Sequence, residues 1–179
     1  LRIDLSAIAK GYAVDELARL LDEAGFTDYM VEIGGEVRTR GHRPEGTPWR
    51  IALESPLAGT REVLRVLPLS GESVASSGDY RNFFEHMGRR YGHTIDPRSG
   101  WPVEHGLGAA SVIAASCMAA DAWATALMVL GAEEGLRIAE REGLAANLVT
   151  RSQDGFVESM TSAYRTRAGA LDPQAGEAR

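Results

Sequence analysis

The sequence predicts an α+β fold, in which a largely antiparallel sheet packs with several helices, and three observations support this prediction. Short apolar segments typical of strands recur along the chain, and some are joined by tight glycine turns that link antiparallel neighbours. Segments with the helical spacing of apolar residues stand between them. No internal repeat and no domain linker divides the 179 residues, a length that suffices for one domain with a core.

The chain opens with a helix signal. Either Asp4 or Ser6 is suited to cap the first turn, and Gly25 is suited to end the helix. The apolar side chains that roughly follow helical spacing are Ile8, Tyr12, Leu17, Leu20 and Leu21. A first helix is therefore expected between these limits.

Strands are expected to follow this helix. Residues 29–33 form the first, and Gly34-Gly35 makes a tight turn into a second strand at 37–40. Residues 41–47 are polar and turn-rich, and are predicted as a loop. Four further strands are predicted at 49–53, 62–69, 73–77 and 82–86.

The remainder alternates between strand and helix signals. Residues 92–108 are rich in polar residues, Gly and Pro, so a long loop is expected there, one that either carries function or connects elements. The elements predicted after it are a strand at 111–115, helices at 117–130 and 132–142, and strands at 145–150 and 155–160 around a turn at 153–155. The tail after Tyr164 is expected to be frayed.

Composition and charge exclude several classes of protein. Apolar residues at 44% and charged residues at 25% are ordinary for a globular protein, and a net charge of −6 argues against a nucleic-acid partner. The single cysteine, Cys117, excludes an internal disulfide. Residues 111–132 are apolar over a length that would span a membrane, but Asp121 in the middle would cost about 2.5–3.5 kcal/mol. We therefore predict no membrane span, but a buried strand followed by a buried helix.

Asp121 and Thr125 are the first candidate site residues. They lie four residues apart on an otherwise apolar helix, so both side chains point to one face. A carboxylate and a hydroxyl that converge there are hard oxygen ligands of the kind that magnesium takes. The alternative is structural: Asp121 bonds a nearby helix end and Thr125 bonds its own backbone. Spacing alone favours this alternative.

Other candidates also have two interpretations. Gly34-Gly35 lets backbone N–H groups approach a phosphate, or is a plain hairpin turn. His93 stands three residues before Asp96 in the polar loop, and is either a general base or an ordinary surface histidine. Lys10 is the single lysine of the chain. It is either a point charge beside a phosphate, or a lysine that stands there by chance and has no role in the site.

Five segments taken together resemble one family. They are DLSAIAKGYAVD at 4–15, IGG at 33–35, SGDYRN at 77–82, HTIDPRSGWP at 93–102 and ADAWATAL at 120–127. In this order and spacing they are similar to the motifs of the ApbE family, the FAD:protein FMN transferases. The resemblance implies an ApbE-like, T-fold-like arrangement of a mixed, largely antiparallel sheet with helices.

The resemblance also implies a metal site. In the family, Mg²⁺ is held by a backbone carbonyl of the first motif and by the Asp and Thr of the last, which here are Ala7, Asp121 and Thr125. Some members carry a second acid just before the threonine, where this chain has Ala124. This departure leaves the affinity for the metal more dependent on Asp121.

Flavin-binding residues are implied in the same way. The positions that match cofactor contacts are Asp4, Lys10, Gly34, Gly35 and Ile95. His93 matches the histidine implicated in catalysis, and Asp96 is suited to orient it. The metal ion would be Mg²⁺, and FAD would be the substrate.

The activity implied by the resemblance is transfer of FMN from FAD onto a Thr or Ser hydroxyl of a target flavoprotein, with release of AMP. Positioning and charge neutralisation do most of the work in such an attack on a pyrophosphate. Two alternatives remain open: a magnesium-dependent FAD pyrophosphatase that yields AMP and FMN, and a non-catalytic FAD-binding protein. Family members are often exported lipoproteins, so a periplasmic or membrane-anchored location is expected, with the cytoplasm as the alternative. Because members generally exceed 250 residues, we expect residues 1–164 to be the C-terminal portion of an ApbE-like domain, followed by a frayed tail at 165–179.

Overall fold

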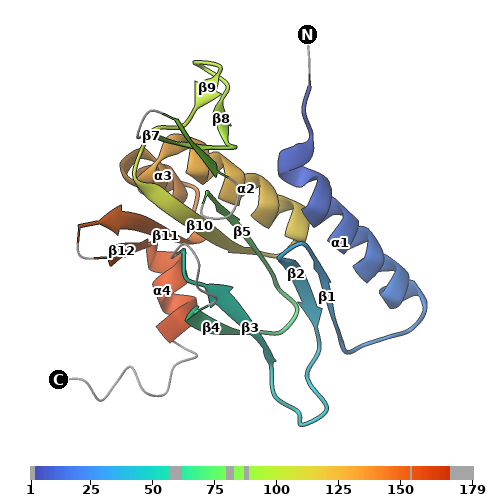
Figure 1. Ribbon diagram of the computed structural model, residues 1–179. Helices are drawn as coiled ribbons and strands as arrows, with labels where there is room; N and C mark the ends of the chain where they lie inside the picture. The colour runs from blue at the N-terminus through green and yellow to red at the C-terminus, as the bar shows by residue number, and fades with distance from the viewer. Residues whose placement is uncertain (1–2, 57–61, 80–82, 87–88, 154, 170–179) are drawn as a thin grey trace, which may run out of the picture.

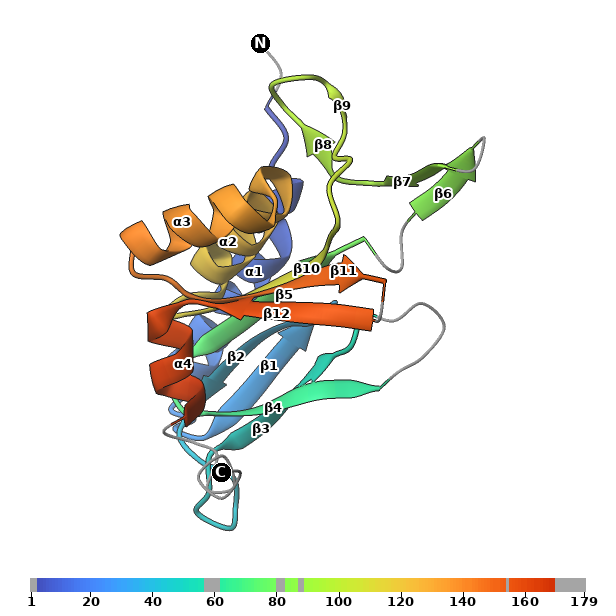
Figure 2. The ribbon, with the colours of Figure 1, turned by 90° about the vertical axis from the view of Figure 1, so that its left-hand side faces the viewer.

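The computed structural model describes residues 3–56, 62–79, 83–86, 89–153 and 155–169, and it shows an α+β fold in three layers (Figures 1 and 2). A central sheet lies between one layer of helices and one layer formed by a hairpin and a short helix. The elements, in chain order, are α1 (Ser6–Glu23), β1 (Tyr29–Ile33), β2 (Glu36–Arg40), β3 (Trp49–Glu54), β4 (Val63–Leu69), β5 (Ser73–Gly78), β6 (Phe83–His86), β7 (Arg89–Gly92), β8 (Ile95–Asp96), β9 (Trp101–Pro102), β10 (Leu107–Ala114), α2 (Cys117–Leu130), α3 (Ala132–Arg141), β11 (Ala145–Ser152), β12 (Gly155–Met160) and α4 (Ser162–Gly169).

The central sheet has six strands in the order β1-β2-β5-β10-β11-β12, and all of its pairs are antiparallel. The Gly34-Gly35 turn joins β1 to β2, and both glycines have positive φ, 61° and 100°. A two-residue turn with two positive φ angles matches the right-handed twist of an antiparallel hairpin and strongly favours glycine. The predicted hairpin turn is therefore confirmed.

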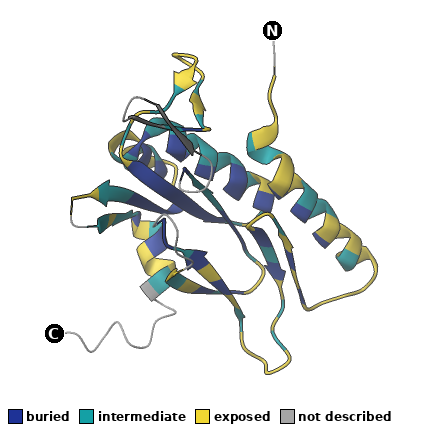
Figure 3. Cartoon of the chain, in the orientation of Figure 1, coloured by how far each residue is buried: buried dark blue, intermediate teal, exposed yellow. Residues whose placement is uncertain are grey.

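Helices α1, α2 and α3 cover one face of the sheet (Figure 2). Strand β10 is buried along almost its whole length, which is why residues 107–114 are nearly continuous in apolar and small side chains. Figure 3 shows this burial running from β10 into the inner side of α2. The core on this face consists of Leu107, Ala110, Val112, Ala124, Leu127, Met128, Ala139, Ala146 and Leu148, with a smaller cluster of Val14, Ala18, Tyr29, Val31 and Cys117 under α1.

The β3–β4 hairpin and α4 cover the opposite face. Alternate residues of β3 are buried there, as expected for a strand with one face toward a core. Tyr164 on α4 is fully buried in this core. The other members are Val37, Ile51, Leu53, Leu67, Leu69, Val74, Ile113 and Ala145.

Three segments differ from the sequence-based expectation, and one of them is the strand β7 at Arg89–Gly92, where no strand was predicted. The strand predicted at 111–115 begins at Leu107, and the loop predicted at 92–108 contains the short β8–β9 hairpin. Residues 165–169, expected in a frayed tail, belong to α4, because Tyr164 anchors that helix in the core. The pattern was missed because Gly106 and Gly108 obscure the start of β10 and because α4 has few apolar residues.

In the described part of the chain, no helix combines the length and the apolar character that a membrane crossing requires.

Candidate functional site

The site forms where α1 crosses the beginning of α2. The crossing is close at Gly11, which is buried: a Cβ atom added there would lie 2.4 Å from the carbonyl oxygen of Cys117. Real Cβ atoms do not approach backbone oxygen so closely, so only glycine permits this separation of the two helices. The glycine of the first motif is therefore required by packing.

Asp121 lies in this contact and is 2% exposed. Its Oδ2 accepts a hydrogen bond from the backbone N–H of Gly11 at 2.9 Å. Burial raises the pKa of this carboxyl above its usual value, and the Gly11 hydrogen bond and the charge of Lys10 act in the opposite direction. An acid held in the interior by one backbone donor is short of positive charge, and a cation would supply it.

Asp15 makes the second connection between the helices. Its two carboxylate oxygens accept hydrogen bonds from the backbone N–H groups of Cys117 and Met118, both at 2.9 Å, and Arg38 pairs with it at 2.7 Å. These N–H groups belong to the first turn of α2, which has no partners of its own for them. Asp15 thus caps α2 from the side of α1. Sequence reasoning missed this role, although Asp15 is the last residue of the first motif.

The two connections between the helices repeat at an interval of four residues on each helix. Gly11 and Asp15 lie four residues apart on α1, as Cys117 and Asp121 do on α2. Gly11 pairs with Asp121 and Asp15 with Cys117, so the two helices run in opposite directions through these contacts. One further step of four along each helix leads to Ala7 and Thr125. In addition, the Gly11 N–H that binds Asp121 is the donor that an α-helix assigns to the Ala7 carbonyl.

Thr125 lies against the sheet. Its Oγ1 is 3.0 Å from Oγ of Ser77, at the end of β5, and the two hydroxyls form a hydrogen bond. The structural alternative predicted that Asp121 bonds a helix end, but its partner Gly11 lies in the second turn of α1. Thr125, expected in that alternative to bond its own backbone, has a side-chain partner on β5. Asp121 and Thr125 thus carry a carboxylate and a hydroxyl on the same side of α2.

Lys10 is held by an acid that sequence reasoning missed. Its Nζ lies 2.6 Å from Oε1 of Glu36, the first residue of β2, which is only 1% exposed. Burial raises the pKa of Glu36, Lys10 lowers it, and the charge of Asp121 raises it further. The only signal in the sequence was an acid that directly follows the Gly34-Gly35 turn.

Asp4 lies at the start of α1 and is exposed. Its Oδ1 accepts a hydrogen bond from the backbone N–H of Ser6 at 2.8 Å, and hydrogen bonds with Ser6 lower its pKa. This satisfies one of the free donors of the first helical turn. Asp4 therefore has a structural role in the described structure, beside the cofactor contact that the resemblance implies.

His93 and Ile95 lie on another segment, beside the β8–β9 hairpin. His93 is exposed, and Ile95 is 47% exposed. Asp96, expected to orient His93, uses both carboxylate oxygens to bind Nε and Nη2 of Arg98, at 3.0 and 2.8 Å. Figures 1 and 2 show this hairpin at the end of the molecule where α1 begins.

The three oxygen ligands implied by the resemblance, the Ala7 carbonyl, the Thr125 hydroxyl and the Asp121 carboxylate, include one titratable side chain. Within the described ranges, no group of three or more His, Cys, Asp and Glu residues is placed to hold a metal ion. A site built from a carbonyl, a hydroxyl and Asp121 contains a single member of that set, so it would not form such a group. Its donors are hard oxygens, which fit Mg²⁺ by type.

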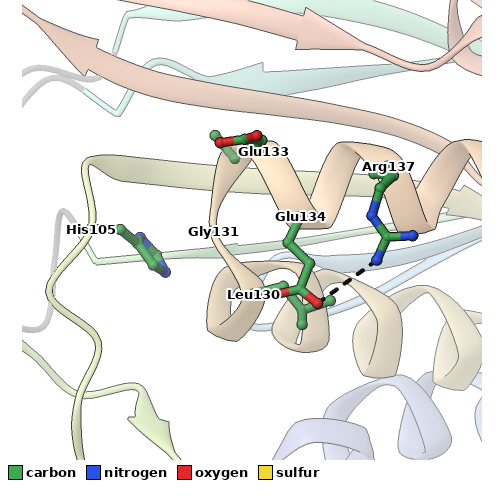
Figure 4. A pocket seen from close by; sticks show the side chains of 7 residues that line it. His105, Leu130, Gly131, Glu133, Glu134 and Arg137 are labelled. Atoms are coloured by element: carbon green, nitrogen blue, oxygen red, sulfur yellow. Dashed lines mark ion pairs between the residues drawn. The ribbon is translucent and has the colours of Figure 1, made fainter.

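A separate pocket lies at the junction of α2 and α3 (Figure 4). His105 lines it from the chain before β10, and its ring packs on Gly131. Glu134 and Arg137 form an ion pair at 3.8 Å on its α3 side. The pocket contains none of the predicted site residues.

Comparisons with known proteins cover most of the chain. Residues 1–148 match the model of the ApbE family. A protein of Haemophilus influenzae named FAD:protein FMN transferase is 46% identical over 164 residues, 91% of this chain and 47% of the relative. The protein of the same name from Escherichia coli strain K12 is 42% identical over 166 residues, 93% of this chain and 47% of the relative.

Solved structures agree with this result. The apo form of the Pseudomonas stutzeri flavinyl transferase ApbE superposes with a TM-score of 0.85 at 49% identity, over 94% of this chain and 52% of that one. The apbe protein of Thermotoga maritima superposes with a TM-score of 0.82 at 29% identity, over 93% and 53%. The chain thus spans about half the length of the curated relatives it matches.

Proposed function

Because the chain belongs to the ApbE family, we propose that it takes part in the magnesium-dependent transfer of FMN from FAD to a Thr or Ser hydroxyl of a target flavoprotein, with release of AMP. The name shared by its relatives, FAD:protein FMN transferase, supplies the donor and the class of acceptor.

The observation that carries the proposal is the buried carboxylate of Asp121 at the crossing of α1 and α2. Gly11 binds Oδ2, and we assign Oδ1 to the metal ion. Ala7 and Thr125, one step further along the two helices, would contribute a backbone carbonyl and a hydroxyl. These three oxygens come from the first and last motifs of the chain, which only the helix crossing brings together.

When bound, Mg²⁺ would neutralise charge on the diphosphate of FAD and on the departing AMP. Lys10, whose side chain is 46% exposed, adds a positive charge on the same side. The hydroxyl oxygen of the target would attack the phosphorus of the FMN group, and the bond between that phosphorus and the AMP oxygen would break. His93 would accept the hydroxyl proton.

The test is an assay with FAD, Mg²⁺ and an acceptor flavoprotein. We expect flavin to become covalently attached to the acceptor and AMP to be released in equal amounts. Asp121→Ala should abolish both, because Ala124 stands where some family members carry a second acid, whereas Glu134→Gln on the exposed side of α3 should retain both. Unchanged AMP release by Asp121→Ala would contradict the metal assignment.

Omitting the acceptor distinguishes the alternatives. A transferase leaves FAD largely intact without its acceptor, whereas a pyrophosphatase forms AMP and free FMN from FAD alone. Binding of FAD without magnesium-dependent turnover under either condition would identify a flavin-binding protein.

A further inference from the structure

Glu36 is a buried acid with half of its hydrogen-bonding capacity unused. Its Oε1 binds Nζ of Lys10, but its Oε2 is buried and has no hydrogen-bond partner among the residues that the structure describes. A buried carboxylate oxygen without a partner costs free energy. Such a residue calls for an explanation beyond stability, since an apolar residue at the same place would avoid this cost.

Lys10 lies within the electrostatic reach of two buried acids. It forms a direct ion pair with Glu36, and its charge also acts on Asp121, whose pKa it lowers against the effect of burial. Lysine has a long flexible stem, and nearly half of this side chain is exposed, so its ammonium group is able to move. Lys10 therefore pairs directly with one buried acid and acts electrostatically on a second.

We propose that Glu36 is a positioning residue that holds Lys10 away from Asp121 and so leaves the Asp121 carboxylate available to a divalent cation. The inference rests on the proposed function, because it assumes that Asp121 binds Mg²⁺. An ammonium group paired with Asp121 would occupy the carboxylate and repel the metal ion. Glu36 prevents this pairing, since its own carboxylate is 2.6 Å from Nζ.

The turn before β2 helps to keep the pair in place. A Cβ atom added to Gly34 would lie 3.3 Å from Cδ of Lys10 and 3.6 Å from Oε2 of Glu36. The turn thus packs closely over both side chains, which restricts the stem of Lys10. Glu36 itself is fixed by the backbone pairing of β2 with β1.

A competing explanation uses the same unpartnered oxygen. If Glu36 bound the metal ion through Oε2, its loss would also weaken Mg²⁺ binding. The two explanations differ in the part played by Lys10. If Glu36 acts only by holding Lys10, Mg²⁺ binding no longer depends on Glu36 once the lysine is removed. If Glu36 is itself a ligand, Mg²⁺ binding still depends on it after the lysine is removed.

The experiment is a calorimetric titration of the purified protein with Mg²⁺ in the absence of FAD. We expect Glu36→Gln to weaken binding by about 10- to 100-fold, the range seen when an outer partner of a metal site is lost. The double variant Lys10→Met/Glu36→Gln should return to the parent affinity. Parent-like binding by Glu36→Gln, or a double variant as weak as Glu36→Gln, would overturn the proposal.

Two further variants keep the result interpretable. Lys10→Met alone retains both acids and should bind Mg²⁺ at least as tightly as the parent, and weaker binding would contradict the proposal even if Glu36→Gln fails to fold. Glu158 lies on β12, at the far edge of the sheet, and pairs with Arg65 at 3.5 Å. Glu158→Gln breaks that ion pair and should bind Mg²⁺ like the parent.

Failure of the proposed function has a different signature. In that case the parent protein shows no Mg²⁺ binding, or Asp121→Asn binds as the parent does, and the inference falls with the site. When the parent binds and Asp121→Asn does not, the behaviour of the Glu36 and Lys10 variants decides the inference alone.

Discussion

The carboxylate of Asp121 accepts the backbone N–H of Gly11 at 2.9 Å, and this bond ties the acid that we propose as the metal ligand on α2 to the second turn of α1. Because Gly11 also sets how closely the helices approach, the position of Asp121 and the separation of α1 from α2 are determined together. Changes at this crossing should therefore affect stability and metal binding at once.

Gly11→Ala tests this dependence. The added Cβ would meet the Cys117 carbonyl at 2.4 Å, so the helices must separate, and overpacking of this kind costs about 1–3 kcal/mol. We expect urea unfolding to show a loss of this size, together with weaker Mg²⁺ binding. Gly106→Ala is the control: its nearest contact would be an ordinary 3.6 Å, and both quantities should stay near the parent values.

Asp15→Asn tests the cap of α2. The amide keeps one oxygen for the N–H groups of Cys117 and Met118, but loses the charge that pairs with Arg38. Loss of a helix cap typically costs about 1 kcal/mol, and we expect a decrease in thermal stability of that order or somewhat more. Ser116→Ala removes the side-chain cap at the same helix end and provides the comparison. A stability equal to that of the parent would show that Asp15 is not needed as a cap.

His93→Ala separates binding from chemistry. His93 is exposed and lies on a different segment from the α1–α2 crossing, so its loss should leave the proposed metal site intact. We expect flavin attachment to an acceptor protein to be lost while FAD binding, followed by flavin fluorescence, stays nearly unchanged. Comparable flavin attachment by the variant would remove His93 from the proposed mechanism.

Stability should fall at alkaline pH because two buried groups resist ionisation. Burial raises the pKa of Cys117 from 9.0, and that of Tyr164 from 10.0, to about 12 in each case. Their contribution is complete below the unfolded pKa values and is lost as pH rises from about 9 to 12, because the unfolded chain releases these protons first. Each pKa unit corresponds to about 1.4 kcal/mol.

Tyr164→Phe gives the corresponding measurement. Chemical unfolding at several pH values should show a shallower decline between pH 10 and 12 than in the parent, while the decline near pH 9–10, which belongs to Cys117, stays. An identical slope above pH 10 would mean that Tyr164 does not resist ionisation in the folded protein.

Most secondary structure was predictable because it depends on local patterns. The helix at 117–130 and the strands at 29–33 and 155–160 agree with the structure to the residue. The start of β10 and the extent of α4 were not predictable, because burial against neighbours, rather than local propensity, holds those residues in place.

The sequence by itself determined the α+β class, the family resemblance, and the candidates Asp121 and Thr125, because periodicity and motif order are properties of the chain. Only the tertiary structure decided that Gly11 binds Asp121, that Asp15 caps α2, and that Glu36 holds Lys10. These pairs are separated by 26 to 110 residues. Contacts over such separations arise only when packing brings distant segments together, so no local pattern in the sequence records them.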